Sequence, residues 1–190
     1  MKILIINGNP DNGSFCAALA DSYRNGAEEK AHEVKLVHLS DLKFDPVLKY
    51  GYKQIQELEP DLIRIREDIT DSDHLCFVFP TWWSTYPALF KGFIDRIFLP
   101  GFGFKFKKGS PFPEKYFKGK TARLLITMDG PAFFYKYFLS KPGINSIKKG
   151  LLEFCGVKPV KYTIFASIKS TDEAKRKKML AEAEKLGSAL

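Results

Sequence analysis

Short apolar segments alternate along the chain with longer segments in which apolar residues recur every three or four positions. Residues 2–6 and 73–79 are apolar almost throughout, which is typical of strands covered on both faces of a sheet. Residues 33–39, where apolar positions alternate, are predicted to be a strand as well. Residues 121–128 and 160–166 complete a set of five predicted strands.

Helices are predicted to follow these strands, at residues 14–25, 54–69, 87–98, 148–155 and 172–186. Ser14 is expected to cap the first helix, Pro87 suits the first position of a helix, and Gly156 suits the position just after one. Residues 99–120 are rich in Gly, Pro, Phe and Lys and show neither helical nor strand spacing. A loop of this length in a compact domain tends to be functional, so it is predicted to form a wall of the site.

Five alternations of strand and helix predict an α/β fold, a doubly wound five-stranded parallel sheet with helices on both faces. Neither an internal repeat nor a linker interrupts the pattern. The 190 residues are therefore expected to form a single domain, 1–190. A domain of this size buries roughly 70% of its unfolded surface.

Composition narrows the class of protein further. Hydrophobic residues make up 45% of the chain and charged residues 27%, as is ordinary for a soluble globular protein. Cys16, Cys76 and Cys155 are far apart and form no CxxC pair, so neither a disulfide framework nor a metal site is predicted. The N-terminal apolar run reads as a strand rather than a signal peptide, and no run approaches the ~20 residues that span a bilayer. A cytoplasmic protein without membrane insertion is expected.

The formal net charge of the chain is +8. Six lysines of the 99–120 loop alternate with aromatic residues: Lys105, Lys107, Lys108, Lys115, Lys118 and Lys120. This pattern admits a nucleic-acid or membrane-surface module. However, lysine runs more often form solvated faces, and they also attract anionic substrates. No nucleic-acid partner is therefore predicted.

Three loops that follow strands have unusual content, and parallel sheets bind ligands at the carboxyl ends of their strands. The first loop, NGNPDNGS, precedes a helix whose free N–H groups favour an anion. It lacks the lysine of a P-loop, and Pro10 occupies the place of the second glycine in G-x-G-x-x-G. It therefore suits a single phosphate group, held by Asn9, Asn12, Ser14 and the amide of Phe15. The alternative is an Asx-rich turn that binds nothing.

The second loop, PTWWSTY, contains both tryptophans of the chain, Trp82 and Trp83, directly after Pro80 and Thr81. Backbone amides here can bind the polar edge of a planar heterocycle, while an indole covers its face. The alternative is that both indoles only fill a core or an interface.

The third loop, TMDGPAFFY, begins with Thr127, Asp129 and Gly130 and continues into aromatic residues. The three loops together offer sites for a monophosphate, a sugar chain and a flat aromatic ring. These are the parts of FMN, which is the cofactor predicted from the residues alone.

Four segments resemble the flavodoxin-like NAD(P)H:quinone oxidoreductases, the DT-diaphorase-like family, in its shorter members. They are GNPDNGSFCAAL, FPTWWSTYPALFKGFIDRIF, TMDGPAFFY and LLEFCG, and the resemblance covers nearly the whole chain. It implies a sheet of order 2-1-3-4-5, a tightly bound flavin, and a homodimer with active sites at its interface. It also implies two-electron transfer from NAD(P)H to quinones.

The resemblance assigns cofactor-binding residues to all three loops by position. Asn9, Ser14, Phe15 and Cys16 fall in the phosphate loop, Pro80, Thr81, Trp82 and Trp83 flank the flavin ring, and Thr127, Met128, Asp129 and Gly130 meet its pyrimidine edge. Asn9 stands where histidine is common in the family, and Cys16 where asparagine is usual. The chain also lacks the long carboxyl-terminal extension of the longer members, so FMN is favoured and FAD stays an alternative.

The expected activity is a ping-pong reaction in which hydride passes from NAD(P)H, the co-substrate, through the flavin to a quinone or similar aromatic acceptor. Tyr135 is the predicted catalytic residue, as hydrogen-bond donor to a quinone oxygen, with Phe133 and Phe134 as a roof. The apolar band of the helix at 87–98 is predicted to be a dimer contact. Two other functions stay open: a flavodoxin-type electron carrier and a regulatory flavoprotein subunit of a transport system.

Overall fold

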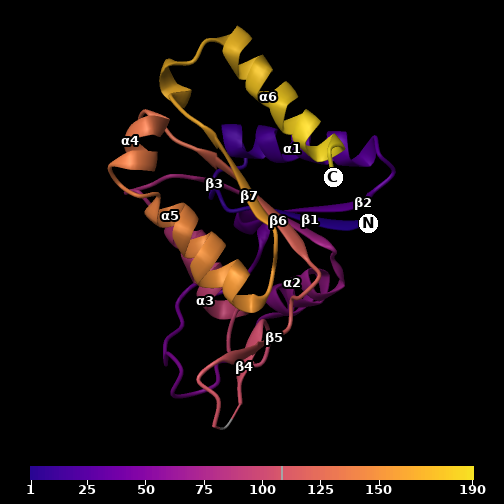
Figure 1. The fold of residues 1–190 in the computed structure, drawn as a ribbon, viewed down its shortest axis with the longest axis vertical. Coiled ribbons are helices and arrows are strands. Elements are labelled where there is room, and N and C mark those ends of the chain that lie inside the picture. The colour runs from indigo at the N-terminus through magenta and orange to yellow at the C-terminus, as the bar shows by residue number, and fades with distance from the viewer. Residues whose placement is uncertain (108) are drawn as a thin grey trace.

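The computed structural model describes residues 1–107 and 109–190, so Lys108 of the lysine-rich loop lies outside the described part. Five strands form one parallel sheet: β1 (Lys2–Asn7), β2 (Glu33–His38), β3 (His74–Pro80), β6 (Thr121–Thr127) and β7 (Val160–Phe165) (Figure 1). Their order is β2-β1-β3-β6-β7, in which β6 and β7 are the fourth and fifth strands of the sheet along the chain. The predicted doubly wound sheet of order 2-1-3-4-5 is confirmed.

Helices cover both faces of the sheet (Figure 1). On one face lie α1 (Phe15–Glu28) and α6 (Glu173–Ser188), and on the other α2 (Pro60–Asp71), α3 (Ala88–Ile97) and α5 (Pro142–Asn145), which continues as a π-helix, η2 (Ser146–Glu153). Two 3₁₀ turns, η1 (Leu39–Asp41) and η3 (Ile168–Ser170), and the short helix α4 (Ala132–Tyr137) each follow a strand. Across residues 1–107 and 109–190, none of the helices has the length and the apolar run that a membrane crossing requires.

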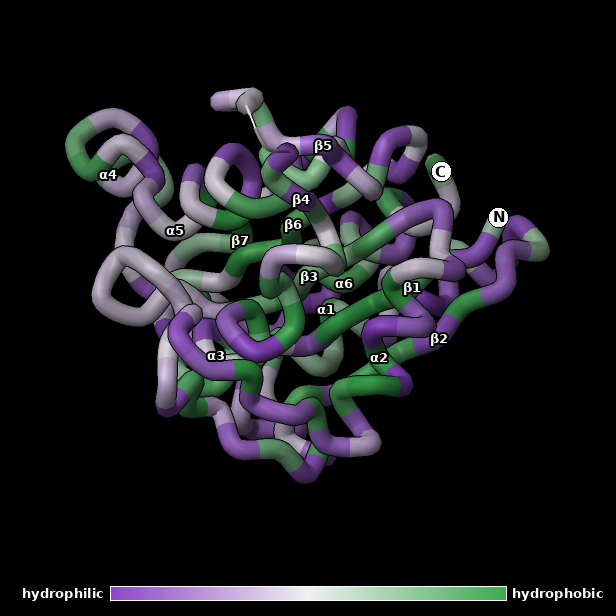
Figure 2. Tube along the Cα trace, turned by 90° about the horizontal axis from the view of Figure 1, so that it is seen from below, coloured by the Kyte–Doolittle hydropathy of each residue, from purple (hydrophilic) through white to green (hydrophobic). Residues whose placement is uncertain are grey.

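The two faces of the sheet form two separate apolar cores, because side chains alternate along each strand. Leu4 and Ile6 face α2 and α3 and belong to the same core as Phe77. Their neighbours Ile3 and Ile5 face α1 and α6. Figure 2 shows the resulting pattern, which is hydrophobic along the central strands and polar on the outer turns.

Helices α1 and α6 pack so closely that two glycines are required between them. A Cβ on Gly26 would lie 1.9 Å from the carbonyl oxygen of Glu184, and a Cβ on Gly187 would lie 2.1 Å from that of Tyr23. Both helices begin at the edge of the sheet where the strands end. They are closest near their C-terminal ends, and near their starts Arg176 of α6 lies 5.8 Å from the Phe15 ring of α1.

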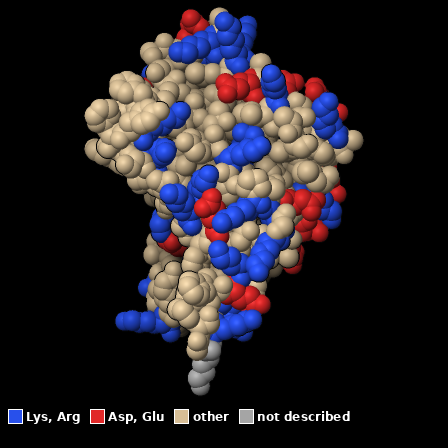
Figure 3. All heavy atoms as spheres, in the orientation of Figure 1, with Lys and Arg blue, Asp and Glu red and all other residues tan. Residues whose placement is uncertain are grey.

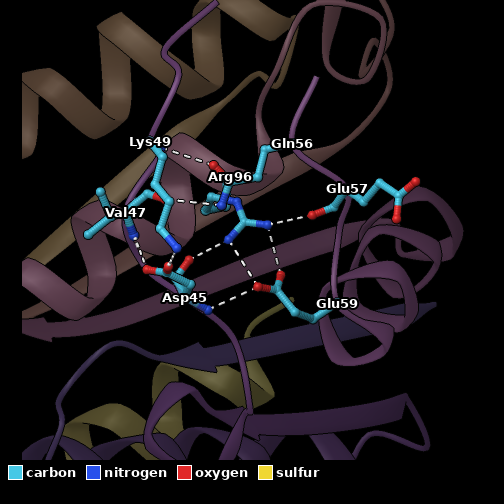
Figure 4. Close-up of polar contacts among 7 residues, drawn as sticks. All are labelled: Asp45, Val47, Lys49, Gln56, Glu57, Glu59 and Arg96. Carbon is cyan, nitrogen blue, oxygen red and sulfur yellow. Dashed lines mark hydrogen bonds and ion pairs between the residues drawn. The ribbon is translucent and has the colours of Figure 1, made fainter. Parts of the chain in front are cut away.

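The second helix begins at Pro60, later than the predicted start at residue 54, because Pro60 suits the first position of a helix and not its interior. A buried arginine binds the segment that precedes it. The Arg96 side chain is fully buried and donates to the carbonyl oxygens of Asp45 and Glu57 (Figure 4). It also pairs with the Glu59 carboxylate, with 2.8 Å between Nη2 and Oε2. The Glu57 carbonyl thus bonds to a side chain instead of a helical N–H, and tertiary contacts override the local helical pattern.

The 99–120 loop contains a short hairpin, although no strand is predicted there. β4 (Phe104–Phe106) and β5 (Pro113–Lys115) pair in antiparallel fashion. Phe104 packs edge-on against Phe154, with ring centroids 4.8 Å apart. Strands of three residues are too short to produce a readable alternation of apolar and polar positions.

The apolar band of α3 is used inside the monomer. Phe90, Phe93 and Ile97 are completely buried in the core beneath the sheet, and Ile94 and Phe98 nearly so. The prediction that this band is a dimer contact is therefore wrong, because its bulky rings fill the space between α3 and the sheet. Exposed large apolar side chains lie elsewhere, before α2 (Val47, Tyr50, Tyr52, Ile55) and on or next to α4 (Phe133, Phe134, Tyr137, Phe138).

Candidate functional site

The carboxyl ends of β1, β3 and β6 meet in one cleft of about 170 Å³. Its lining residues are Asn9, Phe15, Cys16, Pro80, Thr81, Trp82, Thr127, Met128, Asp129 and Ile168. All of these except Ile168 are residues that the sequence singled out. Of the residues predicted to bind the cofactor, Asn12, Ser14, Trp83 and Gly130 lie outside this lining. The Asn12 side chain is bonded to Asp41 and Ser40 instead.

The loop after β1 is shaped by its own side chains. The Asn7 side chain accepts from the Asn9 N–H at 3.1 Å, Asn9 accepts from Asp11 N–H at 3.0 Å, and Asp11 accepts from Gly13 N–H at 2.8 Å. The Ser14 hydroxyl accepts from the Ala17 N–H at 3.4 Å, so the predicted N-cap is confirmed. These Asx turns hold the loop open at the start of α1, where the first helical N–H groups have no partner within the helix.

The loop after β3 carries a buried hydroxyl that lacks a partner. The Thr81 N–H donates to the Thr127 carbonyl at 2.7 Å, which ties the loops after β3 and β6 together. The Thr81 hydroxyl oxygen is buried without a hydrogen bond to any residue that the structure describes. Buried polar groups are nearly always bonded, so this hydroxyl is available to a group bound in the cleft.

The two tryptophans of this loop differ in their surroundings. Trp82 lines the cleft and is 48% exposed, whereas Trp83 is 99% exposed and contributes nothing to the lining. Trp82 is therefore the indole that can cover a flat ligand bound in the cleft.

The loop after β6 brings to the cleft a carboxylate that is paired with a lysine. The Asp129 carboxylate accepts from the Lys169 N–H at 3.2 Å, and its other oxygen pairs with the Lys169 ammonium at 3.2 Å. Thr127 lies deeper, with its hydroxyl oxygen 3.2 Å from the Cys16 sulfur. Burial raises the pKa of the Cys16 thiol, so this group stays protonated and acts as a packing residue at neutral pH.

The loop after β7 contributes to the site, and sequence reasoning missed it. Ile168 lines the cleft, and its carbonyl accepts from the Arg176 guanidinium at 3.2 Å. That guanidinium lies 5.8 Å from the centre of the Phe15 ring, so it places positive charge beside the start of α1. The strand order provides the signal: β7 lies next to β6, so its carboxyl end reaches the same edge of the sheet.

Tyr135 does not line the cleft. Its side chain is 4% exposed, and its hydroxyl donates to the Ser84 carbonyl at 3.3 Å while accepting from the Ile144 N–H at 3.4 Å. This geometry gives no support to the predicted role as donor to a quinone, because the proton already has a backbone acceptor. By contrast, Phe133 and Phe134 are exposed. The surface around α4 is mostly uncharged in Figure 3, with Lys and Arg side chains at its margin.

A larger groove of about 640 Å³ lies elsewhere on the molecule. It is lined by the segment before α2 and by Leu99 and Pro100, and it shares no residue with the cleft. Its walls are mainly apolar and also include Gln54, Gln56 and Arg66. Among the described residues, no three His, Cys, Asp or Glu side chains come together as a metal site would require.

The sequence as a whole matches a known family. A family model described as a flavodoxin-like fold matches residues 1–187. The chain therefore belongs to this family of flavodoxin-like proteins.

Two relatives each align with 95% of the chain. An uncharacterized NAD(P)H oxidoreductase of Haemophilus influenzae is 28% identical over 185 residues, which cover 91% of that protein. NAD(P)H dehydrogenase (quinone) 1 of Cavia porcellus is 26% identical over an alignment of 209 residues, which covers 74% of that protein. The predicted membership among flavodoxin-like NAD(P)H:quinone oxidoreductases is confirmed.

Two solved structures share the fold. Smu.1420 from Streptococcus mutans UA159 superposes with a TM-score of 0.86 at 32% identity, and the match covers 100% of both chains. An FMN-dependent NADH-azoreductase from Bacillus anthracis, solved in complex with FMN, superposes with a TM-score of 0.75 at 18% identity and covers 99% of this chain and 98% of that one. The likeness to the azoreductase concerns the fold alone.

Proposed function

We propose that this NAD(P)H oxidoreductase is flavin-dependent and passes two electrons, as hydride in a ping-pong cycle, to a quinone or a similar aromatic acceptor. The observation that carries the proposal is the cleft at the carboxyl ends of β1, β3 and β6, where phosphate donors lie beside a half-exposed indole. The names of the two relatives support the reaction class, and FMN in the azoreductase structure supports the cofactor.

FMN fits the residues that surround the cleft. The start of α1 offers free N–H groups to an anion, the orphaned Thr81 hydroxyl offers a hydrogen bond, and Trp82 offers a flat apolar surface. The residues from Asn9 to Cys16 would hold the phosphate, and Trp82 with the turn at 127–129 would hold the ring. When bound, FMN supplies a hydride acceptor and donor, which no side chain can supply.

The chain's own residues would orient the ligand and adjust the charge around it. Lys169 pairs with Asp129, so this carboxylate adds no uncompensated negative charge where electrons arrive. Arg176 adds positive charge beside Phe15, which favours a phosphate. Phe133 and Phe134 expose their rings and could contact a flat acceptor.

We further propose FMN rather than FAD, and a homodimer. The exposed apolar side chains before α2 and on α4 are candidates for the dimer contact, since large exposed apolar patches usually mark an interaction site. Chromatography of the cofactor released by denaturation distinguishes FMN from FAD. Light scattering on the eluting protein gives its mass, and a monomer at micromolar concentration would contradict the dimer.

The decisive experiment is the visible spectrum of the protein after incubation with FMN and desalting. We expect a retained flavin spectrum that NADPH bleaches without air and that a quinone restores. Steady-state rates at several fixed quinone concentrations should give parallel double-reciprocal lines, as a ping-pong cycle requires. A colourless protein would contradict the proposal, and a flavin that quinones do not reoxidise would support the electron-carrier alternative.

The Thr81→Val variant tests the site itself, because it removes the orphaned hydroxyl and keeps the shape of the side chain. The Kd for FMN should rise roughly threefold to tenfold, the effect of one lost hydrogen bond. Thr70→Val, on the exposed side of α2, is the matched control and should bind FMN like the wild type. Equal affinity for Thr81→Val and the wild type would remove Thr81 from the site.

A further inference from the structure

Two consecutive residues of the loop after β3 have left-handed backbone conformations. Trp83 has φ of +48° and Ser84 has φ of +64°, and neither is glycine. Residues other than glycine avoid this region because their Cβ atoms crowd the backbone. Such conformations persist only where surrounding contacts hold them, and they occur most often at functional sites.

The Thr85 N–H closes this turn locally by donating to the Trp82 carbonyl at 2.9 Å, and the carbonyl of Ser84 is the point at which a distant segment binds it. The Ser84 carbonyl accepts from the Gly143 N–H at 3.1 Å and from the Tyr135 hydroxyl at 3.3 Å. The approach is so close that a Cβ on Gly143 would lie 2.9 Å from the Thr85 Cα. The Trp83–Ser84 turn therefore rests on donors from the segment after β6, more than 50 residues away along the chain.

That segment contains a second left-handed pair. Ser140 has φ of +56° and Lys141 has φ of +55°. The Lys141 N–H donates to the backbone carbonyl of Tyr135 at 3.1 Å, and the Ile144 N–H donates to the Tyr135 hydroxyl at 3.4 Å. Tyr135 thus contacts both turns, one through its backbone and one through its hydroxyl.

We propose that Tyr135 is a positioning residue that binds the Trp83–Ser84 turn through its buried hydroxyl and the Ser140–Lys141 turn through its backbone carbonyl, and thereby sets Trp82 at the edge of the cleft. The hydroxyl donates to Ser84 and accepts from Ile144 of α5 at once, which phenylalanine cannot do. Burial raises the pKa of this phenol, so its proton is present at any working pH. The consequence for flavin binding rests on the proposed function, but the consequence for the turn does not.

The chain provides its own reporter, because its two tryptophans both lie in this loop. Tyr135→Phe is compared with Tyr137→Phe, which removes a hydroxyl from the same helix. Tyr137 is 79% exposed, and its hydroxyl makes no hydrogen bond within the described part of the chain. For Tyr135→Phe without flavin, we expect altered tryptophan bands in near-UV circular dichroism and faster quenching of fluorescence by acrylamide. Tyr137→Phe should match the wild type.

Flavin binding provides the second readout. The Kd of Tyr135→Phe for FMN should rise roughly threefold to tenfold, as for one lost hydrogen bond, while kcat with saturating FMN changes less than twofold. Gly143→Ala disturbs the other hydrogen bond to the Ser84 carbonyl, because its Cβ would lie 2.9 Å from the Thr85 Cα. It should give the same spectral change, so the proposal stays testable if one variant folds poorly.

The result that would overturn the proposal is a Tyr135→Phe protein with wild-type tryptophan spectra and wild-type affinity for FMN. If its kcat with a quinone also falls tenfold or more, the hydroxyl acts on the acceptor, as the sequence predicts. If the wild type binds no flavin, the proposed function is wrong, but the proposal that Tyr135 holds the turn is still decided by the tryptophan spectra.

Discussion

His74 makes the stability of this protein depend on pH, and the dependence can be worked out from its surroundings. The imidazole lies at the start of β3, where Nε2 is 3.0 Å from the Tyr23 hydroxyl and Nδ1 is 2.7 Å from the Thr121 hydroxyl. Burial, followed by the nearby charge of Arg123, lowers the pKa of His74 from 6.5 to about 4. Further contributions of the same sign come from His32 and Lys161, and no carboxylate is among the causes.

A lowered histidine pKa stabilises the folded state at neutral pH and loses this contribution on acidification. The unfolded chain takes up a proton near pH 6.5, whereas the folded chain does so only near pH 4. Between these values the unfolded state binds more protons, so the free energy of unfolding falls as the pH falls. The loss is roughly 2 kcal/mol at pH 5 and approaches about 3 kcal/mol at pH 4.

Urea titrations at pH 7.5 and pH 5 measure this effect. His74→Gln should be less stable than the wild type at pH 7.5, since it disturbs a buried network, but should lose roughly 2 kcal/mol less on going to pH 5. Equal m-values at the two pH values ensure that the same transition is compared. If wild type and His74→Gln lose the same free energy between the two pH values, the depressed pKa of His74 is refuted.

Three further predictions concern the fold and the cleft. Arg96→Leu should lower the free energy of unfolding in urea by ~3 kcal/mol, because the Glu59 carboxylate and two backbone carbonyls lose the guanidinium as donor. The control Lys91→Ala, which breaks an exposed ion pair on the same helix, should lower it by at most ~0.5 kcal/mol. Gly26→Ala should lower the free energy of unfolding by ~2 kcal/mol or more, since its Cβ would lie 1.9 Å from a backbone oxygen. Gly150→Ala, whose Cβ would have its nearest neighbour at 4.0 Å, should be close to neutral. Equal stabilities of the two variants would contradict the contact between α1 and α6. Arg176→Ala should raise the Kd for FMN roughly threefold at low salt and less at high salt, and a salt-independent Kd ratio would exclude an electrostatic role.

Local patterns of the sequence determine a large part of this protein. Continuous apolar runs specify strands that are buried on both faces, and helical spacing specifies their covering helices, because both depend on burial over a few residues. End signals act over similarly short distances: Ser14 caps α1, and Gly156 has φ of +107° just after a helix. The polar loops after three strands also predict where the site lies, since parallel strands end at a common edge.

Contacts between distant residues decide what the local pattern cannot. Arg96 holds the segment before α2 by binding a carbonyl 39 positions away, and Tyr135 turns its hydroxyl to a carbonyl 51 positions away, out of the cleft. Strand order brings the loop with Ile168, and the first turn of α6 with Arg176, to this edge of the sheet. The backbone of the Trp83–Ser84 turn leaves only one of two adjacent indoles at the cleft. The sequence therefore determines the sheet and the edge at which the cleft lies. The direction of each side chain at that edge follows from hydrogen bonds and packing that form only when remote segments meet.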